Sequence, residues 1–135
     1  MKYNISIVGL IIGTFINMGL GALWYSNLLF AKSWMKEASI TDEDIQSGNM
    51  SQIYGLTAVG ALIASYVLGF LVLNLNITSI ADGLLFAVIL WLGTHLPMII
   101  KNWGFENRSF KLGFINHGYD LVVYFLVISL YIILN

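Results

Sequence analysis

Three ionisable side chains lie within segments that are otherwise apolar, and they are the residues of this chain best suited to chemistry. They are His95, His117 and Asp120. Imidazole changes its charge near neutral pH, so a histidine beside a carboxylate can relay protons. Two imidazoles and a carboxylate can also bind a divalent metal ion. A third interpretation is structural, because hydrogen-bonded polar groups hold membrane helices together.

Further polar residues extend this group. His117 and Asp120 lie three positions apart and Tyr124 follows four positions later, so all three share one face of a helix. Two asparagines lie at compatible depths in their own apolar segments. We therefore expect ligand-binding or proton-relay residues among His95, His117, Asp120, Asn17, Asn116 and Tyr124.

The sequence also argues against several kinds of site. The absence of cysteine removes disulfides, thiolate metal sites and cysteine nucleophiles. No G-x-S-x-G motif supports a catalytic serine. The histidine spacing does not match a metal motif such as H-E-x-x-H. We therefore expect no cofactor and favour no enzymatic activity, and a metal ion at the two histidines and the aspartate is kept only as an alternative.

The elements that carry these residues are expected to lie in a membrane. Hydrophobic residues make up 59% of the 135 residues and charged residues only 10%, whereas soluble proteins average about a quarter charged. A net charge of -1 and the absence of a basic run give no basis for nucleic-acid binding. We predict one all-α domain over residues 1–135, with membrane lipids as its surroundings.

Four apolar segments are long enough to cross a bilayer, which requires roughly 20 helical residues. Helices are expected because these segments lack the alternation of barrel strands. The predicted spans are residues 4–26, 52–73, 80–100 and 112–134. Asp82 follows Ser79 by three positions, which is typical of a helix cap. The predicted fold is an integral membrane four-helix bundle.

The depth of the three ionisable residues favours contact between them. His95 precedes Lys101 by six positions, and His117 and Asp120 follow Leu112 by five and eight. At about 1.5 Å per residue, all three lie roughly 7 to 12 Å from the same membrane boundary. Antiparallel neighbouring helices would therefore bring them together.

The basic residues predict how the chain is oriented, because lysine and arginine in short loops are retained in the cytoplasm. Lys32 and Lys36 lie in loop 27–51, and three more basic residues lie in loop 101–111, whereas residues 74–79 contain none. The two basic loops are therefore predicted to be cytoplasmic, with both termini on the extracytoplasmic side.

The loop over residues 27–51 is long enough to hold a short helix along the membrane interface. Thr41 and Asp44 resemble a capping box, which would begin such a helix. The aromatic residues and lysine around the start of this loop are typical of side chains that anchor at lipid headgroups. The predicted anchor residues are Trp24, Tyr25, Phe30, Lys32 and Trp34.

Small residues recur at helical spacing in the first two spans, which favours close packing of helices in lipid. The first stripe contains Gly9, Gly13 and Gly21, and the second contains Thr57, Ala61, Ser65 and Gly69. The two stripes can pack on each other within one chain or across a dimer interface, and the sequence leaves both arrangements open.

The run G-A-L-W-Y-S-N-L-L-F-A-K-S-W over residues 21–34 resembles the signature of the Domain of Unknown Function 1761 family of small bacterial membrane proteins. Residues 41–45, 105–108 and 115–122 are also similar to that family. The resemblance implies a four-helix membrane bundle, and a bacterial inner-membrane location goes with it. It implies no particular activity.

Together these features predict a small membrane protein that forms a homo-oligomer. Its polar group is expected to be structural or to bind a small ligand or lipid. The alternative is a proton-coupled carrier of a small solute that uses the buried histidines and aspartate. That alternative requires an oligomer, because four helices can hardly enclose a path for a solute.

Overall fold

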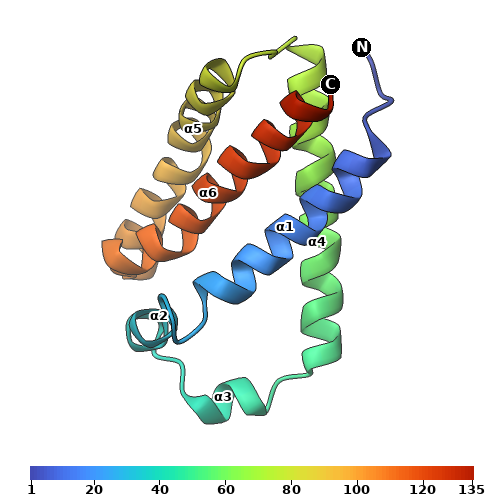
Figure 1. The fold of residues 1–135 in the computed structure, drawn as a ribbon. Helices are drawn as coiled ribbons and strands as arrows, with labels where there is room; N and C mark the ends of the chain where they lie inside the picture. Colours follow the sequence, from blue (N-terminus) through green and yellow to red (C-terminus); the bar gives the residue numbers. More distant parts are fainter.

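The computed structural model describes residues 1–135 and consists of helices without strands (Figure 1). Four helices are long: α1 (Ile7–Trp24), α4 (Met50–Asn74), α5 (Ile80–Glu106) and α6 (Phe110–Leu134). Two short helices, α2 (Ala31–Ala38) and α3 (Asp42–Gln46), lie in the connection between α1 and α4. The predicted all-α fold with four long apolar helices is confirmed.

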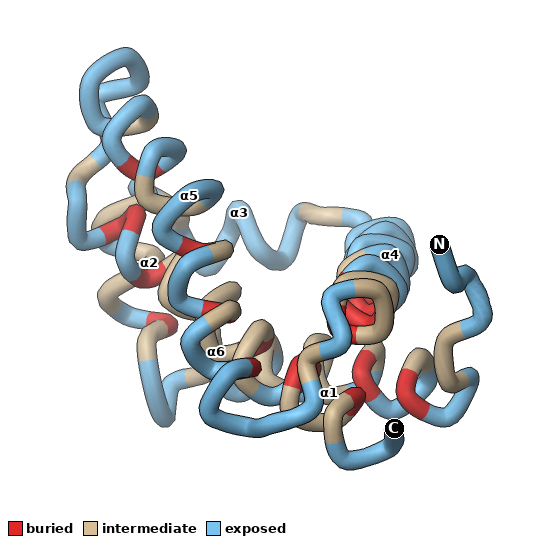
Figure 2. Tube along the Cα trace, turned by 90° about the horizontal axis from the view of Figure 1, so that it is seen from above, coloured by how far each residue is buried: buried red, intermediate tan, exposed pale blue.

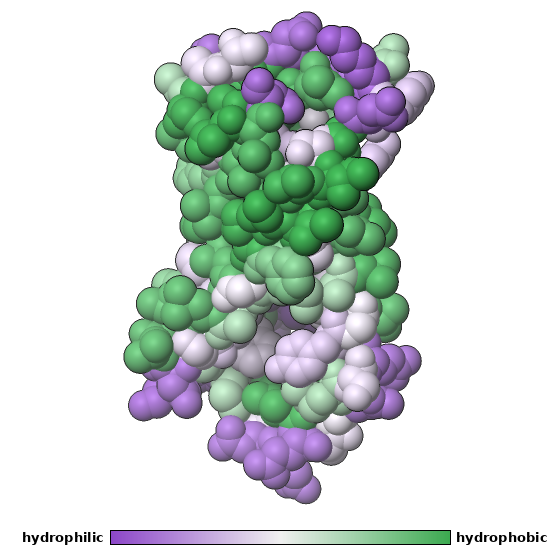
Figure 3. All heavy atoms as spheres, turned by 45° about the vertical axis from the view of Figure 1, so that its right-hand side comes forward, coloured by the Kyte–Doolittle hydropathy of each residue, from purple (hydrophilic) through white to green (hydrophobic).

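The surface of these helices is that of a protein surrounded by lipid. All four long helices are long and apolar enough to cross a membrane. Large apolar side chains such as Phe15, Leu56 and Leu85 are exposed on them. Figure 3 shows hydrophobic residues covering the middle of the molecule and hydrophilic residues gathered towards its two ends. The chain is therefore a small multi-pass membrane protein.

The helix boundaries coincide with the predicted spans at the end of α6 and at the start of α5. The expected cap is present there, since the Asp82 N–H donates to Ser79 Oγ at 3.0 Å. At its other end α5 continues to Glu106 instead of ending at residue 100. The apolar run ends at the charged Lys101. The backbone hydrogen bonds of a helix do not require lipid, so α5 continues beyond that run. Pro97 lies inside α5 without ending it.

The central element is α6, because α1, α2, α4 and α5 all pack against it. Helix α1 also packs against α4, whereas α5 packs extensively only on α6. Both termini and the α4–α5 turn lie at one end of the molecule (Figure 1). Helices α2 and α3 and the α5–α6 turn lie at the other, which we call the α2/α3 end. This arrangement is the one that four antiparallel membrane passes require.

The buried core lies mainly in the half of the molecule nearer the termini, where Tyr131 of α6 enters between α1 and α4. Gly9 and Gly69 both lie directly against its ring. Its hydroxyl lies 3.2 Å from Ser65 Oγ, and Gly13 lies against Ser65 in turn. The two small-residue stripes therefore make contacts within one chain. The core cluster is Leu68, Val72, Ala87, Val123, Val127, Ile128 and Tyr131.

The connection between α1 and α4 contains two short helices, whereas only one was predicted from the sequence. The capping box predicted for α3 is present: the Asp44 N–H donates to Thr41 Oγ1 at 3.1 Å and the Thr41 N–H donates to Asp44 Oδ2 at 2.8 Å. Ser39 separates the two helices, and its backbone lies in the left-handed region with φ of 56°. Serine rarely adopts this conformation, so the sequence did not indicate it. Helix α2 is held to α6 by the Ser109 hydroxyl, which donates to Glu37 Oε2 at 2.7 Å.

Candidate functional site

His95 of α5 meets His117 and Asp120 of α6 where these two helices pack, nearer the α2/α3 end. His95 Nδ1 lies 2.8 Å from His117 Nδ1 and 3.4 Å from Asp120 Oδ2. His117 Nδ1 lies 3.6 Å from the same carboxylate oxygen. The contact expected from the depth of the three residues is therefore present, while their role stays a prediction.

Tyr124 completes this group from the next turn of α6. Its hydroxyl lies 2.8 Å from His95 Nε2, so both ring nitrogens of His95 have a partner. A neutral imidazole carries one N–H and one acceptor nitrogen. His95 therefore donates one of these two hydrogen bonds and accepts the other. We call His95, His117, Asp120 and Tyr124 the polar cluster.

Trp91 holds the polar cluster in place from one turn earlier on α5. Its indole N–H donates to the His117 carbonyl oxygen at 2.6 Å. Its ring also stacks on that of His95, with centroids 6.4 Å apart and planes at 12°. These two contacts fix the height of α5 against α6 and the direction in which His95 faces.

The polar cluster is partly buried and remains open on one side. The side chains of His95 and His117 retain 16% and 14% of their exposure, whereas that of Asp120 retains 34%. One potential ligand atom from each of the three lies within 4.8 Å of the others. Such an arrangement can form a hydrogen-bonded proton chain or hold a metal ion.

The two asparagines that the sequence analysis grouped with these residues do not lie in the polar cluster. They belong to a second set of contacts, between α1 and α6. The Tyr119 hydroxyl donates to the Asn17 carbonyl at 2.6 Å and contacts the Asn17 side-chain oxygen. The Tyr25 hydroxyl donates to Asn116 Oδ1 at 2.9 Å.

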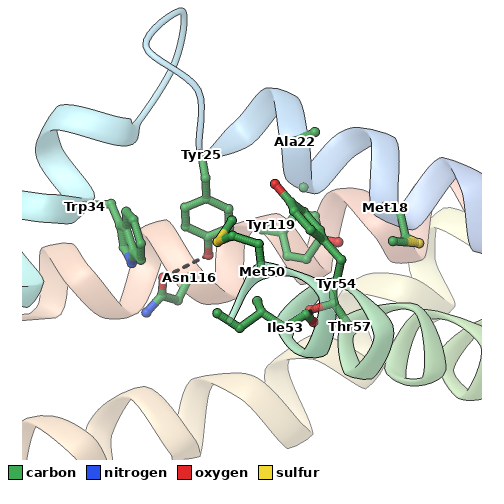
Figure 4. Close-up of a pocket in the computed structure, with 11 residues that line it drawn as sticks. Met18, Ala22, Tyr25, Trp34, Met50, Ile53, Tyr54, Thr57, Asn116 and Tyr119 are labelled. Atoms are coloured by element: carbon green, nitrogen blue, oxygen red, sulfur yellow. Dashed lines mark hydrogen bonds between the residues drawn. The ribbon is translucent and has the colours of Figure 1, made fainter. Parts of the chain in front are cut away.

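A cleft of about 640 Å³ lies beside this second set of contacts (Figure 4). Side chains of α1, α2, α4 and α6 surround it, and eight of its eleven lining residues are hydrophobic, so it is mainly an apolar site. The lining residues are Met18, Gly21, Ala22, Tyr25, Trp34, Met50, Ile53, Tyr54, Thr57, Asn116 and Tyr119.

The first half of α4 gives the cleft an open side. From Met50 to Gly60 every residue except Ala58 is exposed, because this part of α4 diverges from the other long helices (Figure 1). Figure 2 shows the exposed length of α4 standing apart from α2 and α5. The cleft can therefore be reached from the side of the molecule.

Two of the predicted anchor residues, Tyr25 and Trp34, line this cleft, and Trp24 lies beside it against α6. The Trp24 indole N–H donates to the Ile115 carbonyl oxygen at 2.8 Å, and its ring packs on Phe30 with centroids 4.6 Å apart. Tyr25 packs edge-on against Trp34 at 5.2 Å. Of the five residues only the lysine is exposed. Residue types and spacing gave no sign of these internal contacts, and anchoring at headgroups stays a prediction.

Comparison with known proteins gives a family and no activity. The family model described as protein of unknown function, DUF1761, matches residues 8–132. No curated protein and no solved structure matches the chain.

Proposed function

The chain belongs to the DUF1761 family, and we propose that it is a membrane protein that binds an uncharged amphipathic molecule in the cleft between α1, α4 and α6. The single observation that carries this proposal is the cleft itself. Its volume of about 640 Å³ lies within the range of about 300 to 1,000 Å³ that is typical of small-molecule sites.

The lining of the cleft indicates that the ligand carries no net charge. It contains no lysine, arginine, histidine, aspartate or glutamate. A charged group would therefore lie in an apolar site without a partner, which is costly inside a membrane. The apolar lining instead fits a hydrocarbon chain or ring system.

Polar groups of the lining select the head group of such a ligand. The Asn116 side-chain oxygen already accepts from Tyr25, so its amide NH₂ remains available to donate. Tyr54 contributes a hydroxyl from the exposed half of α4. Amide and phenol groups donate well to a carbonyl or hydroxyl oxygen. A long-chain alcohol, ester or ketone combines this kind of head group with an apolar body.

The route into the cleft supports a ligand that is dissolved in the membrane. The divergent half of α4 leaves the cleft open at the side, and exposed apolar residues such as Ile53 and Leu56 border that opening. A molecule that already lies among lipid tails would enter there without crossing a polar surface.

Tryptophan fluorescence tests the proposal, because Trp34 lines the cleft. The full chain in lipid nanodiscs is titrated with a long-chain alcohol that carries bromine near its hydroxyl, a neutral quencher with an apolar tail. We expect saturable quenching that is mostly lost in Trp34→Phe.

Two matched substitutions make this test specific. Ala22→Phe fills the cleft and should weaken quenching at least tenfold. Leu23→Phe, on the adjacent exposed position, should leave it unchanged. Asn116→Leu keeps the volume but removes the amide and should also weaken binding. Quenching that never saturates, or that is equal in all these variants, would contradict the proposal.

The proton-coupled carrier stays a second candidate, supported by one observation. Tyr124, His95 and His117 form a continuous hydrogen-bonded chain, and Asp120 lies one turn from Asn116, which lines the cleft. The carrier would also require the predicted homo-oligomer. Proton uptake into sealed vesicles that depends on an added solute, and is lost in His95→Asn, would support it. Vesicles that take up no protons with any tested solute would count against it.

A further inference from the structure

Two imidazole nitrogens and one carboxylate oxygen converge between α5 and α6. The ligand proposed for the cleft does not contact them. We propose that His95 Nδ1, His117 Nδ1 and one carboxylate oxygen of Asp120 bind one divalent transition-metal ion, with Zn²⁺ as the probe. The site is separate from the cleft, since none of the three residues lines it.

The distances between the three atoms fit a tetrahedral metal centre. For metal–ligand bonds of about 2.0 to 2.1 Å, tetrahedral ligand atoms lie about 3.4 Å from one another. The two distances to Asp120 Oδ2 are 3.4 and 3.6 Å. The distance between the two imidazole nitrogens is 2.8 Å, so the rings must separate by about 0.6 Å when the ion enters.

Tyr124 orients His95 as a metal ligand requires. A metal-bound histidine uses its other ring nitrogen to donate to a second group, and this bond fixes the tautomer. His95 Nε2 lies 2.8 Å from the Tyr124 hydroxyl, and in the tautomer that donates from Nε2 to this hydroxyl, Nδ1 carries no proton and faces the site. The Trp91 indole bond to the His117 carbonyl holds the backbone of the second ligand in place.

The chemistry of the donor atoms selects the class of ion. Two imidazoles suit zinc and other first-row transition metals, whereas Mg²⁺ and Ca²⁺ prefer sites made of oxygen ligands. Three protein ligands leave a fourth position open, as in zinc sites that bind water or a substrate. The Asp120 side chain, with 34% exposure, marks the side from which a fourth ligand can reach the ion.

The composition of the chain makes the test unusually direct. His95 and His117 are the only histidines and there is no cysteine. Protein purified without a polyhistidine tag therefore has no other imidazole or thiolate. The full chain is stripped with a chelator, and its Zn²⁺ affinity is measured by competition with a chromogenic chelator. We expect one equivalent of Zn²⁺, no competition by excess Mg²⁺, and X-ray absorption distances of about 2.0 to 2.1 Å to nitrogen and oxygen.

Conservative variants show whether the three side chains are the ligands. Asp120→Asn should weaken Zn²⁺ binding at least tenfold and His117→Gln at least a hundredfold, while Asp82→Asn at the exposed cap should have no effect. Tyr124→Phe keeps all three ligands and should weaken binding about 10- to 100-fold, which separates ligation from a folding defect.

Two results would overturn the metal site. One is wild-type protein that retains no Zn²⁺ above the level of the His117→Gln variant. The other is a bound ion whose affinity is the same in Asp120→Asn and in wild type. Asn116→Leu tests the cleft alone and should leave Zn²⁺ binding unchanged, so failure of the metal site and failure of the cleft proposal are distinguishable.

Discussion

Two tryptophans on different helices donate their indole N–H groups to α6. Trp24 of α1 bonds to the Ile115 carbonyl at 2.8 Å and Trp91 of α5 bonds to the His117 carbonyl at 2.6 Å. Residues two positions apart on a helix face nearly opposite sides. The two indoles therefore hold α6 from nearly opposite sides, at carbonyls about 3 Å apart along its axis.

Removing either indole N–H should destabilise the protein without removing an aromatic ring. Trp24→Phe and Trp91→Phe should each lower the free energy of unfolding by about 1 to 2 kcal/mol, since each loses one hydrogen bond and some packing. Trp103→Phe is the matched control, because Trp103 is exposed and makes no such bond, and it should change stability by less than about 0.5 kcal/mol. Thermal unfolding in the same detergent measures all three, and equal stability of the three variants would refute this role.

Asp44 in the connecting loop should titrate below its normal range. The Thr41 backbone N–H, and secondarily the Thr41 hydroxyl, lower the pKa of Asp44, because hydrogen bonds to a carboxylate favour its charged form. Its contribution to the start of α3 is therefore present above the ordinary aspartate pKa of about 4 and is lost as pH falls through the lowered value. NMR titration of Asp44 should show this, and Thr41→Val should move the midpoint partly upward. A midpoint at the ordinary value in wild type would refute the cap.

Sequence spacing predicted part of the site and missed the rest for a geometric reason. His117, Asp120 and Tyr124 share a helix face, so their proximity followed from their spacing. Asn17 and Asn116 were grouped with them by depth alone. Depth gives the height of a residue along a helix but not the side to which it points, and both asparagines face the α1–α6 contact instead.

At the level of helices, Gly113 allows α5 and α6 to approach closely beside the polar cluster. A Cβ added at Gly113 would lie 2.6 Å from Ile99 Cγ2, which is closer than carbon atoms can approach. Ile99 is itself only 1% exposed. This contact lies just beyond the polar cluster, towards the α5–α6 turn.

Gly113→Ala should therefore destabilise the protein by about 1 to 3 kcal/mol through overpacking. Gly104→Ala, in α5 with no atom within 4 Å of the added Cβ, should be neutral or more stable by up to about 1 kcal/mol. In the Gly113→Ala background, Ile99→Ala should cost less than it does alone, and additive costs would exclude the close contact. Chemical unfolding of the four proteins measures these values.

Hydropathy located the long helices well because lipid requires apolar residues along each whole span. It could not locate α2 and α3 as separate helices, since Ser39 gives no warning of its left-handed backbone. It also could not show which helices pack together. The small-residue stripes indicated that α1 packs closely with a neighbour, and only the structure shows that this neighbour includes both α4 and Tyr131 of α6.

At the scale of the whole molecule, the four helices do not close around a common axis. Helix α5 packs extensively only on α6, and the first half of α4 diverges to leave the cleft. No residue pattern in α4 predicted this divergence, because a helix that faces lipid on all sides has the same apolar composition as a packed one. The homo-oligomer expected from the sequence stays a prediction, and it cannot use Gly9, Gly13 or Gly69, which are occupied within the chain.

The basic loops predict the orientation of the molecule in the membrane. With both termini at one end and α2 and α3 at the other (Figure 1), tags on the two termini should report the same side. We expect both to be accessible only from outside the cytoplasm, and a tag inserted at Gly48 to be accessible only from the cytosol. Termini that label only from the cytosol would reverse the orientation, and termini on opposite sides would contradict the fold.

Mapping where an uncharged amphipathic molecule is held shows whether the cleft binds it. A long-chain alcohol with a photoreactive group near its hydroxyl is crosslinked to the full chain in nanodiscs, and the labelled residues are identified by mass spectrometry. We predict labels concentrated on residues 18–25, at and just after the end of α1, and on residues 50–57 of α4, and their loss in Ala22→Phe. Labels spread evenly over the apolar surface, including residues 84–92 of α5, would contradict it.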